Sequence, residues 1–285
     1  MDLVGKVAVI TGGTRGIGLA VAKDLIQNGA SRVIISGRDV QEGGKALKVL
    51  KDLCDKDTKA IYVPMDVTSE EELKELFNYT ATNMGGLDIL VNSAAILNES
   101  SMWRRMVDTN VRALITSTEL GIDLMKKFKR PGRGVIVNLS AMYAIKPLPQ
   151  LPVFSGTKAA VRAASLAYSK MKDSNLRIIT ACMGPTNTSM LLNLSPDDIG
   201  EWTKGEQEDL LDMLKAKQKS QKTRESMSGI NLNLVVKSGV PNWVKNSNIL
   251  AIVQSIQHLL SDNAHDRIAL FLKRTGYRVD GYITL

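Results

Sequence analysis

Short apolar runs alternate with longer amphipathic segments along most of this 285-residue chain. Each run is rich in β-branched residues and is followed by a stretch long enough for one helix. The runs lie at 7–10, 33–35, 60–63, 89–91, 135–137, 177–179 and 268–271. Strands that alternate with helices in this way predict a parallel sheet covered by helices on both faces. We therefore expect one doubly wound α/β domain over residues 1–285 with a seven-stranded parallel sheet.

The helical segments carry local start signals. In the Ser-Glu-Glu-Glu run at 69–72, Ser69 is expected to cap a helix while Glu72 reaches back to the N–H of the serine, an arrangement called a capping box. The alternation stops at about 195–245, where an acidic stretch precedes a basic one. That charge order suits the dipole of a helix, and we interpret the segment as a helical lid over a ligand pocket. A partner-binding helix and a solvated surface helix are the alternatives.

Composition limits the classes of partner. The net charge of +8 is compatible with nucleic acid, an acidic membrane surface or an anionic cofactor. The basic residues are scattered and aromatic residues make up only 5% of the chain, which argues against nucleic acid. No apolar stretch is long enough to span a membrane. Cys54 and Cys182 are too far apart to suggest a disulfide framework or a metal site, so we expect a cytoplasmic protein without a metal.

A glycine-rich turn follows the first apolar run and opens the next helix. It reads Thr-Gly-Gly-Thr-Arg-Gly-Ile-Gly over residues 11–18. Gly12, Gly16 and Gly18 permit a tight turn and bring the backbone close to a pyrophosphate at a helix amino terminus. Because the preceding strand and the following helix both agree with this spacing, the turn predicts a Rossmann-type dinucleotide site.

The end of the second strand indicates which dinucleotide binds. An acidic side chain is expected about twenty residues past the turn in NAD-binding domains. Gly37 stands there instead, and Arg38 follows it. Arg38 and Arg15 together suit the extra phosphate of NADP, which a carboxylate would repel. We therefore favour NADP(H) over NAD(H), although Asp39 adds a negative charge nearby.

With these motifs in place, the chain resembles the short-chain dehydrogenase/reductase family, and most closely its branch of 15-hydroxyprostaglandin dehydrogenases and insect-type alcohol dehydrogenases. The resemblance implies adenine contacts at Asp66 and Val67, a proton-relay water at Asn110, and a ribose contact at Lys158. The cofactor-binding residues that we expect are Gly12, Thr14, Arg15, Gly16, Ile17, Gly18, Arg38, Asp66, Val67, Asn92, Ala94, Lys158 and Thr188.

Two positions depart from the family's catalytic pattern. The family places a tyrosine four residues before the lysine, where this chain has Phe154, and a serine thirteen residues before that tyrosine, where it has Ala141. Ser140 is adjacent, but side chains alternate along a strand, so we expect it to point away from the pocket. Tyr143 is the nearby phenol, and we interpret it as a pocket wall rather than a substitute. Asn110 and Lys158 are the catalytic positions that remain.

Three functions are open. We favour an NADP(H)-loaded pseudoenzyme that binds a ligand, and a small lipophilic ligand suits an apolar pocket lining at Leu97, Met142, Leu148, Met190, Leu191 and Trp202. The alternative is an active oxidoreductase for a lipophilic alcohol or ketone, with its proton from Tyr143, from a water on Asn110 and Lys158, or from the substrate. The third is an inactive structural subunit. It would form a homodimer, or a hetero-oligomer with a relative, through helices at 107–127 and 155–173.

Overall fold

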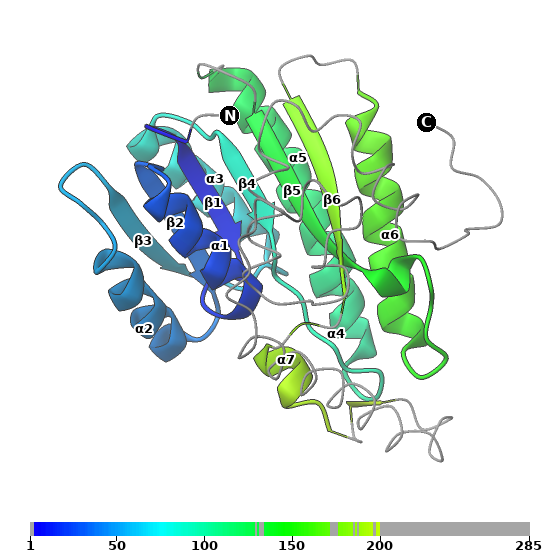
Figure 1. Ribbon diagram of the computed structural model, residues 1–285. Helices are drawn as coiled ribbons and strands as arrows, with labels where there is room; N and C mark the ends of the chain where they lie inside the picture. The colour runs from blue at the N-terminus through cyan, green and yellow to red at the C-terminus, as the bar shows by residue number, and fades with distance from the viewer. Residues whose placement is uncertain are drawn as a thin grey trace, which may run out of the picture.

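The computed structural model describes residues 3–128, 130, 134–171, 176–184, 186, 188–195 and 198–199. Within these ranges six parallel strands form one sheet in the order β3-β2-β1-β4-β5-β6 (Figure 1). They are β1 Val7–Thr11, β2 Arg32–Gly37, β3 Lys59–Pro64, β4 Ile89–Asn92, β5 Gly134–Ala141 and β6 Leu176–Met183. The predicted α/β fold with a parallel sheet is confirmed. The seventh predicted strand, at 268–271, lies outside the described residues.

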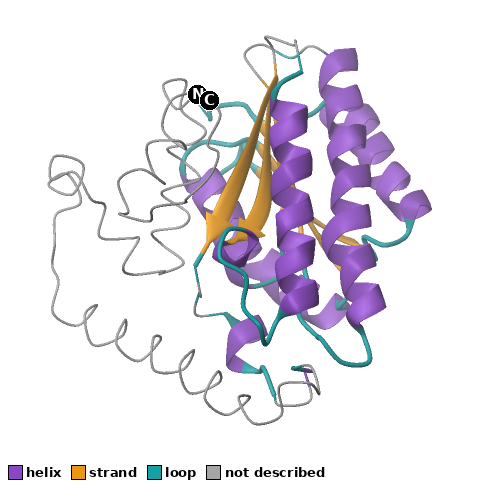
Figure 2. Cartoon of the chain, turned by 90° about the vertical axis from the view of Figure 1, so that its right-hand side faces the viewer, coloured by secondary structure: helices purple, strands orange, loops and turns teal. Residues whose placement is uncertain are grey.

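Helices cover both faces of the sheet. Their bounds are α1 Gly16–Gln27, α2 Val40–Lys51, α3 Glu70–Met84, α4 Trp103–Val107, α5 Ala113–Phe128, α6 Pro152–Ser169 and α7 Ser189–Leu192. α1 and α2 lie in front of the sheet in Figure 1, whereas α3 and α5 lie behind it. Figure 2, turned by 90°, shows long helices packed side by side against the strands. The molecule is therefore a three-layer α/β/α arrangement.

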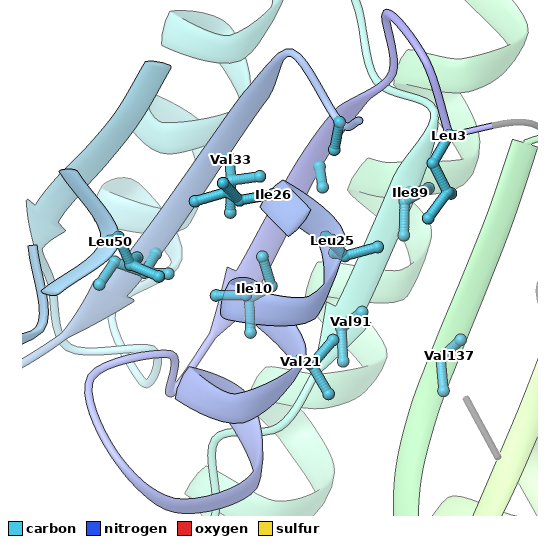
Figure 3. Close-up of a cluster of buried hydrophobic side chains, with 14 of the residues drawn as sticks. Leu3, Ile10, Val21, Leu25, Ile26, Val33, Leu50, Ile89, Val91 and Val137 are labelled. Carbon is cyan, nitrogen blue, oxygen red and sulfur yellow. The ribbon is translucent and has the colours of Figure 1, made fainter. Parts of the chain in front are cut away.

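Alternate residues of each strand feed two separate hydrophobic cores. Ile10 and Val33 pack beneath Val21 and Leu25 of α1 (Figure 3). Their strand neighbours, such as Val9, point the other way and pack with α3 and α5. Burial of each such side chain stabilises the fold by about 1.5–3 kcal/mol relative to exposure. The near-continuous apolar runs of the sequence are explained by this burial on both faces.

The strand order reverses at β1. The chain runs outward from β1 to β2 and β3, then returns to the other side of β1 for β4, β5 and β6. In open α/β sheets this reversal leaves a crevice at the carboxyl ends of the strands, where ligands bind. The glycine turn after β1 and the loops after β4 and β5 all start at this edge.

The start of α3 follows the predicted capping box only in part. Ser69 caps the helix as expected, since its hydroxyl oxygen accepts the N–H of Glu72 at 3.2 Å. The predicted return bond is wrong. The Glu72 carboxylate accepts the N–H of Asp66 at 2.8 Å, because the chain between Asp66 and Ser69 folds into a turn that brings this donor within reach. Glu72 therefore fixes the loop after β3 as well as the helix start.

One turn of π-helix, Asp108–Arg112, joins α4 to α5. A π turn holds one residue more than an α turn, and such turns occur mostly at functional sites. Asn110 lies at its centre and is completely buried. No motif in the sequence predicts this turn.

A third apolar cluster lies beyond the carboxyl ends of β4 and β5. It contains Met106, Ala141, Tyr143, Leu151, Phe154, Leu194 and Ile199. The predicted lid at 195–245 falls almost wholly outside the described residues, which include only 195, 198 and 199 of it. Among the helices that the structure describes, none combines the length and apolar character required to cross a bilayer.

Candidate cofactor and catalytic site

The glycine turn leaves no room for side chains at two of its predicted positions. A Cβ atom on Gly12, whose φ is +65°, would lie 2.6 Å from the Cα of Ala94. A Cβ on Gly18 would collide with the carbonyl oxygen of Gly12. The backbones of the β1 and β4 loops therefore touch, and the amino terminus of α1 is left open at the crevice.

Gly16 and Thr188 lie close together although they are far apart in the sequence. Gly16 has a φ of +55°, and a Cβ there would lie 3.4 Å from Cγ2 of Thr188. Thr188 follows β6, and its N–H donates to the carbonyl of Thr186. Thr188 and Gly16, two predicted cofactor-binding residues, thus lie next to each other, as one dinucleotide pocket requires.

The end of β2 is free of acidic side chains that point toward the turn. A Cβ on Gly37 would lie 2.8 Å from Thr14, so the two residues are in contact. Asp39 is occupied elsewhere, because its carboxylate accepts the N–H groups of Gln41 and Glu42 and caps α2. Arg15 and Arg38 are both exposed. The two guanidinium groups make no ion pair within the described part of the chain.

Asp66 and Val67 lie in the loop after β3. Val67 lines a small cavity with Asn92 and Ala94, and the remaining lining residues are Thr11, Thr109, Ala113, Leu114 and Ser117. Three of the predicted cofactor residues therefore line one cavity at the carboxyl edge of the sheet, and Asp66 precedes Val67 in the same loop. Asp66 also forms an ion pair that sequence reasoning missed, with Arg105 of α4 at 2.7 Å.

The side chain of Asn92 is already fully used by the protein. Its amide donates to Asn138 at 2.8 Å and to Thr118 at 3.1 Å, and its oxygen accepts the hydroxyl of Ser117 at 2.7 Å. Asn138 extends this buried network to Ser165 of α6. The network ties β4 and β5 to the helices behind them, so Asn92 contributes rigidity beneath the pocket.

Asn110 holds the loop after β4 from the π turn. Its side-chain amide donates to the carbonyl of Ile96, and its oxygen accepts the N–H of Ile96, both at 2.9 Å. The same amide lies 3.3 Å from the hydroxyl of Thr157 on α6. Asn110 therefore connects the β4 loop with the helix that carries Lys158.

Lys158 is buried at the carboxyl end of β5. Its ammonium donates to the carbonyl of Leu139 at 3.2 Å and lies 5.6 Å from the ring centre of Phe154. Burial lowers the pKa of Lys158 to about 8, and the Cys182 thiol opposes that shift only in part. A buried amine with one carbonyl partner has N–H groups left for a ligand hydroxyl.

The phenyl ring of Phe154 faces Tyr143. The ring centres are 6.4 Å apart in an edge-to-face arrangement, and both side chains belong to the third apolar cluster together with Ala141. Burial raises the pKa of the Tyr143 phenol to about 12. Ser140 donates its hydroxyl to the backbone carbonyl of Lys158 at 2.8 Å. Ser140 is thus bonded to α6, and its orientation away from the pocket stays a prediction.

Glu99 is a buried residue of this region that sequence reasoning missed. Its carboxylate accepts the N–H of Phe154 at 2.7 Å and that of Val153 at 3.0 Å, at the amino terminus of α6. Burial raises the pKa of Glu99, and the two backbone hydrogen bonds offset part of that shift. The backbone N–H of Glu99 donates to the carbonyl of Asp198 at 2.7 Å. No sequence motif marks this residue, because its partner lies 55 positions away.

These features fit a nicotinamide dinucleotide. The glycine cradle admits a pyrophosphate at the amino terminus of α1, and the buried Lys158 has donors for a ribose hydroxyl. The polar carboxyl edge of the sheet beside the loop after β3 suits an adenosine. Within the described residues there is no cluster of His, Cys, Asp and Glu able to hold a metal ion.

Comparison with known proteins also indicates a family of nicotinamide-dependent dehydrogenases. The profile of the short chain dehydrogenase family matches residues 6–199. Human 15-hydroxyprostaglandin dehydrogenase [NAD(+)] is 32% identical over 202 residues, which cover 70% of this chain and 74% of the relative. The NADP-dependent (R)-specific alcohol dehydrogenase of Lentilactobacillus kefiri is 33% identical, with 67% and 77% covered.

Solved structures agree in fold. A short-chain type dehydrogenase/reductase from Mycobacterium ulcerans superposes with a TM-score of 0.69 at 20% identity, covering 93% of this chain and 86% of that one. The profile match includes the glycine turn and the segment around Lys158. The chain belongs to the short-chain dehydrogenase/reductase family.

Proposed function

We propose that this chain binds NADP(H) but lacks ordinary hydride-transfer activity, and that it acts as a cofactor- and ligand-binding pseudoenzyme. One observation carries the proposal. The ring beside the buried amine of Lys158, at 5.6 Å, is a phenylalanine and has no proton to exchange. Hydride transfer to a carbonyl needs a proton donor at the oxygen.

The neighbouring groups do not replace that donor. Ser140 is engaged with the carbonyl of Lys158. Tyr143 is buried, and a pKa of about 12 makes its phenol a poor acid near neutral pH. Loss of a positioned acid/base lowers a rate by about 10²- to 10⁴-fold. A second loss in the same catalytic unit, at Ala141, does not multiply the first.

The preference for NADP(H) rests on charge at the end of β2. Arg15 and Arg38 are exposed there, and the carboxylate of Asp39 is turned to cap α2. Guanidinium groups bind a phosphate by charge-assisted hydrogen bonds. The relatives are divided on this point, since one is named as an NAD(+) enzyme and another as an NADP-dependent enzyme. The assignment is therefore our inference from the arginines.

The expected ligand is small and lipophilic. Tyr143, Phe154 and Leu194 belong to one apolar cluster, and the amine of Lys158 lies 5.6 Å from the ring centre of Phe154. Partly buried Leu97, Met142, Leu148 and Leu191 pack against the same cluster. An apolar cluster of this kind suits a hydrophobic molecule.

Assembly and location complete the proposal. A homodimer, or a hetero-oligomer with a relative, through α5 and α6 is proposed from the family resemblance. Size-exclusion chromatography of the protein alone, and mixed with an active relative, tests that part. A cytoplasmic location remains a prediction from cysteine usage.

An active oxidoreductase is the alternative, and Tyr143 is the residue that favours it, because its ring lies next to Phe154. The variant Tyr143→Phe separates the two functions. If Tyr143 supplies the proton, the variant loses the turnover that the wild type has. Under the proposal, whatever slow turnover exists is unchanged.

The main experiment combines binding and turnover. Purified protein is titrated calorimetrically with NADPH and with NADH, and NADPH oxidation is then followed with a set of lipophilic ketones. We expect tighter binding of NADPH than of NADH, with no turnover above background. The double variant Ala141→Ser, Phe154→Tyr should gain activity by about 10²-fold or more.

Phe154→Leu is the matched control, because it removes the ring without adding a hydroxyl. It should gain nothing. Wild-type turnover equal to that of the double variant would overturn the pseudoenzyme assignment. Absence of binding to either nucleotide would overturn the cofactor assignment.

A further inference from the structure

Both carboxylate oxygens of Asp66 are occupied by the protein itself. Oδ1 accepts the backbone N–H of Thr68 at 3.0 Å and its hydroxyl at 2.8 Å. Oδ2 accepts Nη2 of Arg105 at 2.7 Å. Arg105 belongs to α4, which follows β4, so this contact closes the polar edge where the adenosine end is expected.

A second guanidinium acts on the same carboxylate. Partial burial would raise the pKa of Asp66, but the Thr68 hydrogen bonds together with the charges of Arg105 and Arg38 lower it. Arg38 comes from the end of β2 and Arg105 from α4. Two cations from different elements thus act on the same carboxylate.

Fold stability gives little reason for this ion pair. The side chain of Arg105 is 43% exposed and that of Asp66 is 29% exposed. Exposed pairs of this kind contribute little, because solvent screens them and both side chains lose freedom. Helix α4 itself holds to the core through the fully buried Met106, the neighbour of Arg105. The position of Arg105 beside the pocket is therefore the informative feature.

We propose that Arg105 is a specificity-determining residue for the adenosine end of the cofactor, and that with Arg38 it binds the 2′-phosphate of NADP(H). The proposal rests on the proposed cofactor function and adds a residue from α4 to the arginines of the β1 turn and β2. An arriving phosphate dianion draws the exposed guanidinium from Asp66 into a bidentate contact. A nucleotide without that phosphate leaves Arg105 on Asp66.

The experiment uses fragments that lack the nicotinamide. The full chain and the variant Arg105→Ala are titrated with 2′,5′-ADP and with 5′-AMP, and then with NADPH and NADH. We expect Arg105→Ala to weaken the binding of 2′,5′-ADP and NADPH by about tenfold or more. The binding of 5′-AMP and NADH should weaken by no more than about twofold. Arg105→Lys, which keeps the charge but loses the fork, should fall in between.

Arg104→Ala is the matched control. Arg104 is the neighbouring arginine on α4, and its guanidinium lies over the Trp103 ring at 4.4 Å. It should leave all four affinities unchanged. Thermal unfolding of each variant verifies that the fold is retained.

Two results would overturn the inference while dinucleotide binding stands. One is an equal loss of affinity for the nucleotides with and without the 2′-phosphate, which would mean that Arg105 only holds Asp66 in place. The other is no loss for either. Failure of the wild type to bind any of the four nucleotides overturns the proposed cofactor function together with this inference.

Discussion

The carboxylate of Glu99 accepts the backbone N–H of Phe154 at 2.7 Å, although 55 residues separate them. Phe154 lies in the first turn of α6, where N–H groups have no partner within the helix. A negative charge at this end is also favoured by the helix dipole. Glu99 therefore fixes the helix that carries both Phe154 and Lys158.

Replacing Glu99 should reveal a pH-dependent stability. The pKa of Glu99 is raised in the folded protein, mainly by burial. A raised pKa means that its contribution to stability is fully present below the unfolded pKa, about 4.3, and is lost as the pH rises through the folded pKa. The wild type should therefore lose stability relative to Glu99→Gln as the pH increases.

Urea unfolding of both proteins at about pH 4.5, 5.5, 6.5 and 7.5 measures this difference. Glu71→Gln, on the exposed start of α3, is the control and should show no such trend. A difference between Glu99→Gln and the wild type that stays constant with pH would contradict the prediction.

Lys158→Met should make the protein more stable and bind NADPH less well. The pKa of Lys158 is lowered to about 8 by burial. Its contribution to stability is present above the unfolded pKa and is lost as the pH falls through about 8, because the buried amine must then take up a proton. Methionine fills the same space without a charge, so we expect a gain of roughly 1–3 kcal/mol near neutral pH.

Urea unfolding at pH 7 and pH 10, together with NADPH titration, tests this prediction. The stability gain should shrink at the higher pH. Lys170→Met, at the exposed end of α6, is the matched control and should change neither quantity. A stability loss at pH 7 would show that the amine is better solvated than its burial indicates.

Ser140→Ala should destabilise the fold and leave turnover unchanged. Its hydroxyl makes a buried hydrogen bond to the carbonyl of Lys158, and loss of such a bond costs about 1 kcal/mol. Ser36→Ala is the control, because the Ser36 hydroxyl is equally buried but lacks a hydrogen-bond partner among the described residues. Ser36→Ala should be neutral or slightly stabilising. Denaturant titration compares the two, and equal effects would contradict the assignment of the Ser140 bond.

Gly12→Ala should abolish dinucleotide binding and lower stability. The new methyl would lie 2.6 Å from the Cα of Ala94, at a backbone φ of +65°. We expect a loss of roughly 1–3 kcal/mol. Gly44→Ala in α2 is the control, since a Cβ there meets nothing within 4 Å and should stabilise the helix by about 0.5–1 kcal/mol. Thermal unfolding and NADPH titration measure both effects, and normal NADPH binding by Gly12→Ala would refute the assigned role of the turn.

The sequence was sufficient for local features. The glycine spacing located the turn, and the apolar runs located six described strands. Each of these depends on neighbours within a few residues. Only one of the two hydrogen bonds of the capping box was predicted correctly. Glu72 accepts the N–H of Asp66, which belongs to the loop before the helix.

Other features depend on contacts between distant segments. Glu99 reaches α6, and Arg105 reaches the loop after β3, across gaps of 55 and 39 residues. Nothing in the sequence around either residue distinguishes it from an ordinary charged surface position. Their roles follow only from the fold, which places the β4 loop and α4 over the carboxyl edge of the sheet.

The π turn at 108–112 has a consequence for how this chain tolerates change. Deleting one residue there would restore regular α-helical pairing and rotate α4 by about 100° relative to α5. Asn110 would then leave Ile96, and the loop after β4 would lose its anchor. Substitutions such as those at 141 and 154 leave this backbone unaltered. The length of this segment is therefore a stricter requirement for the pocket than the identity of the residues at 141 and 154.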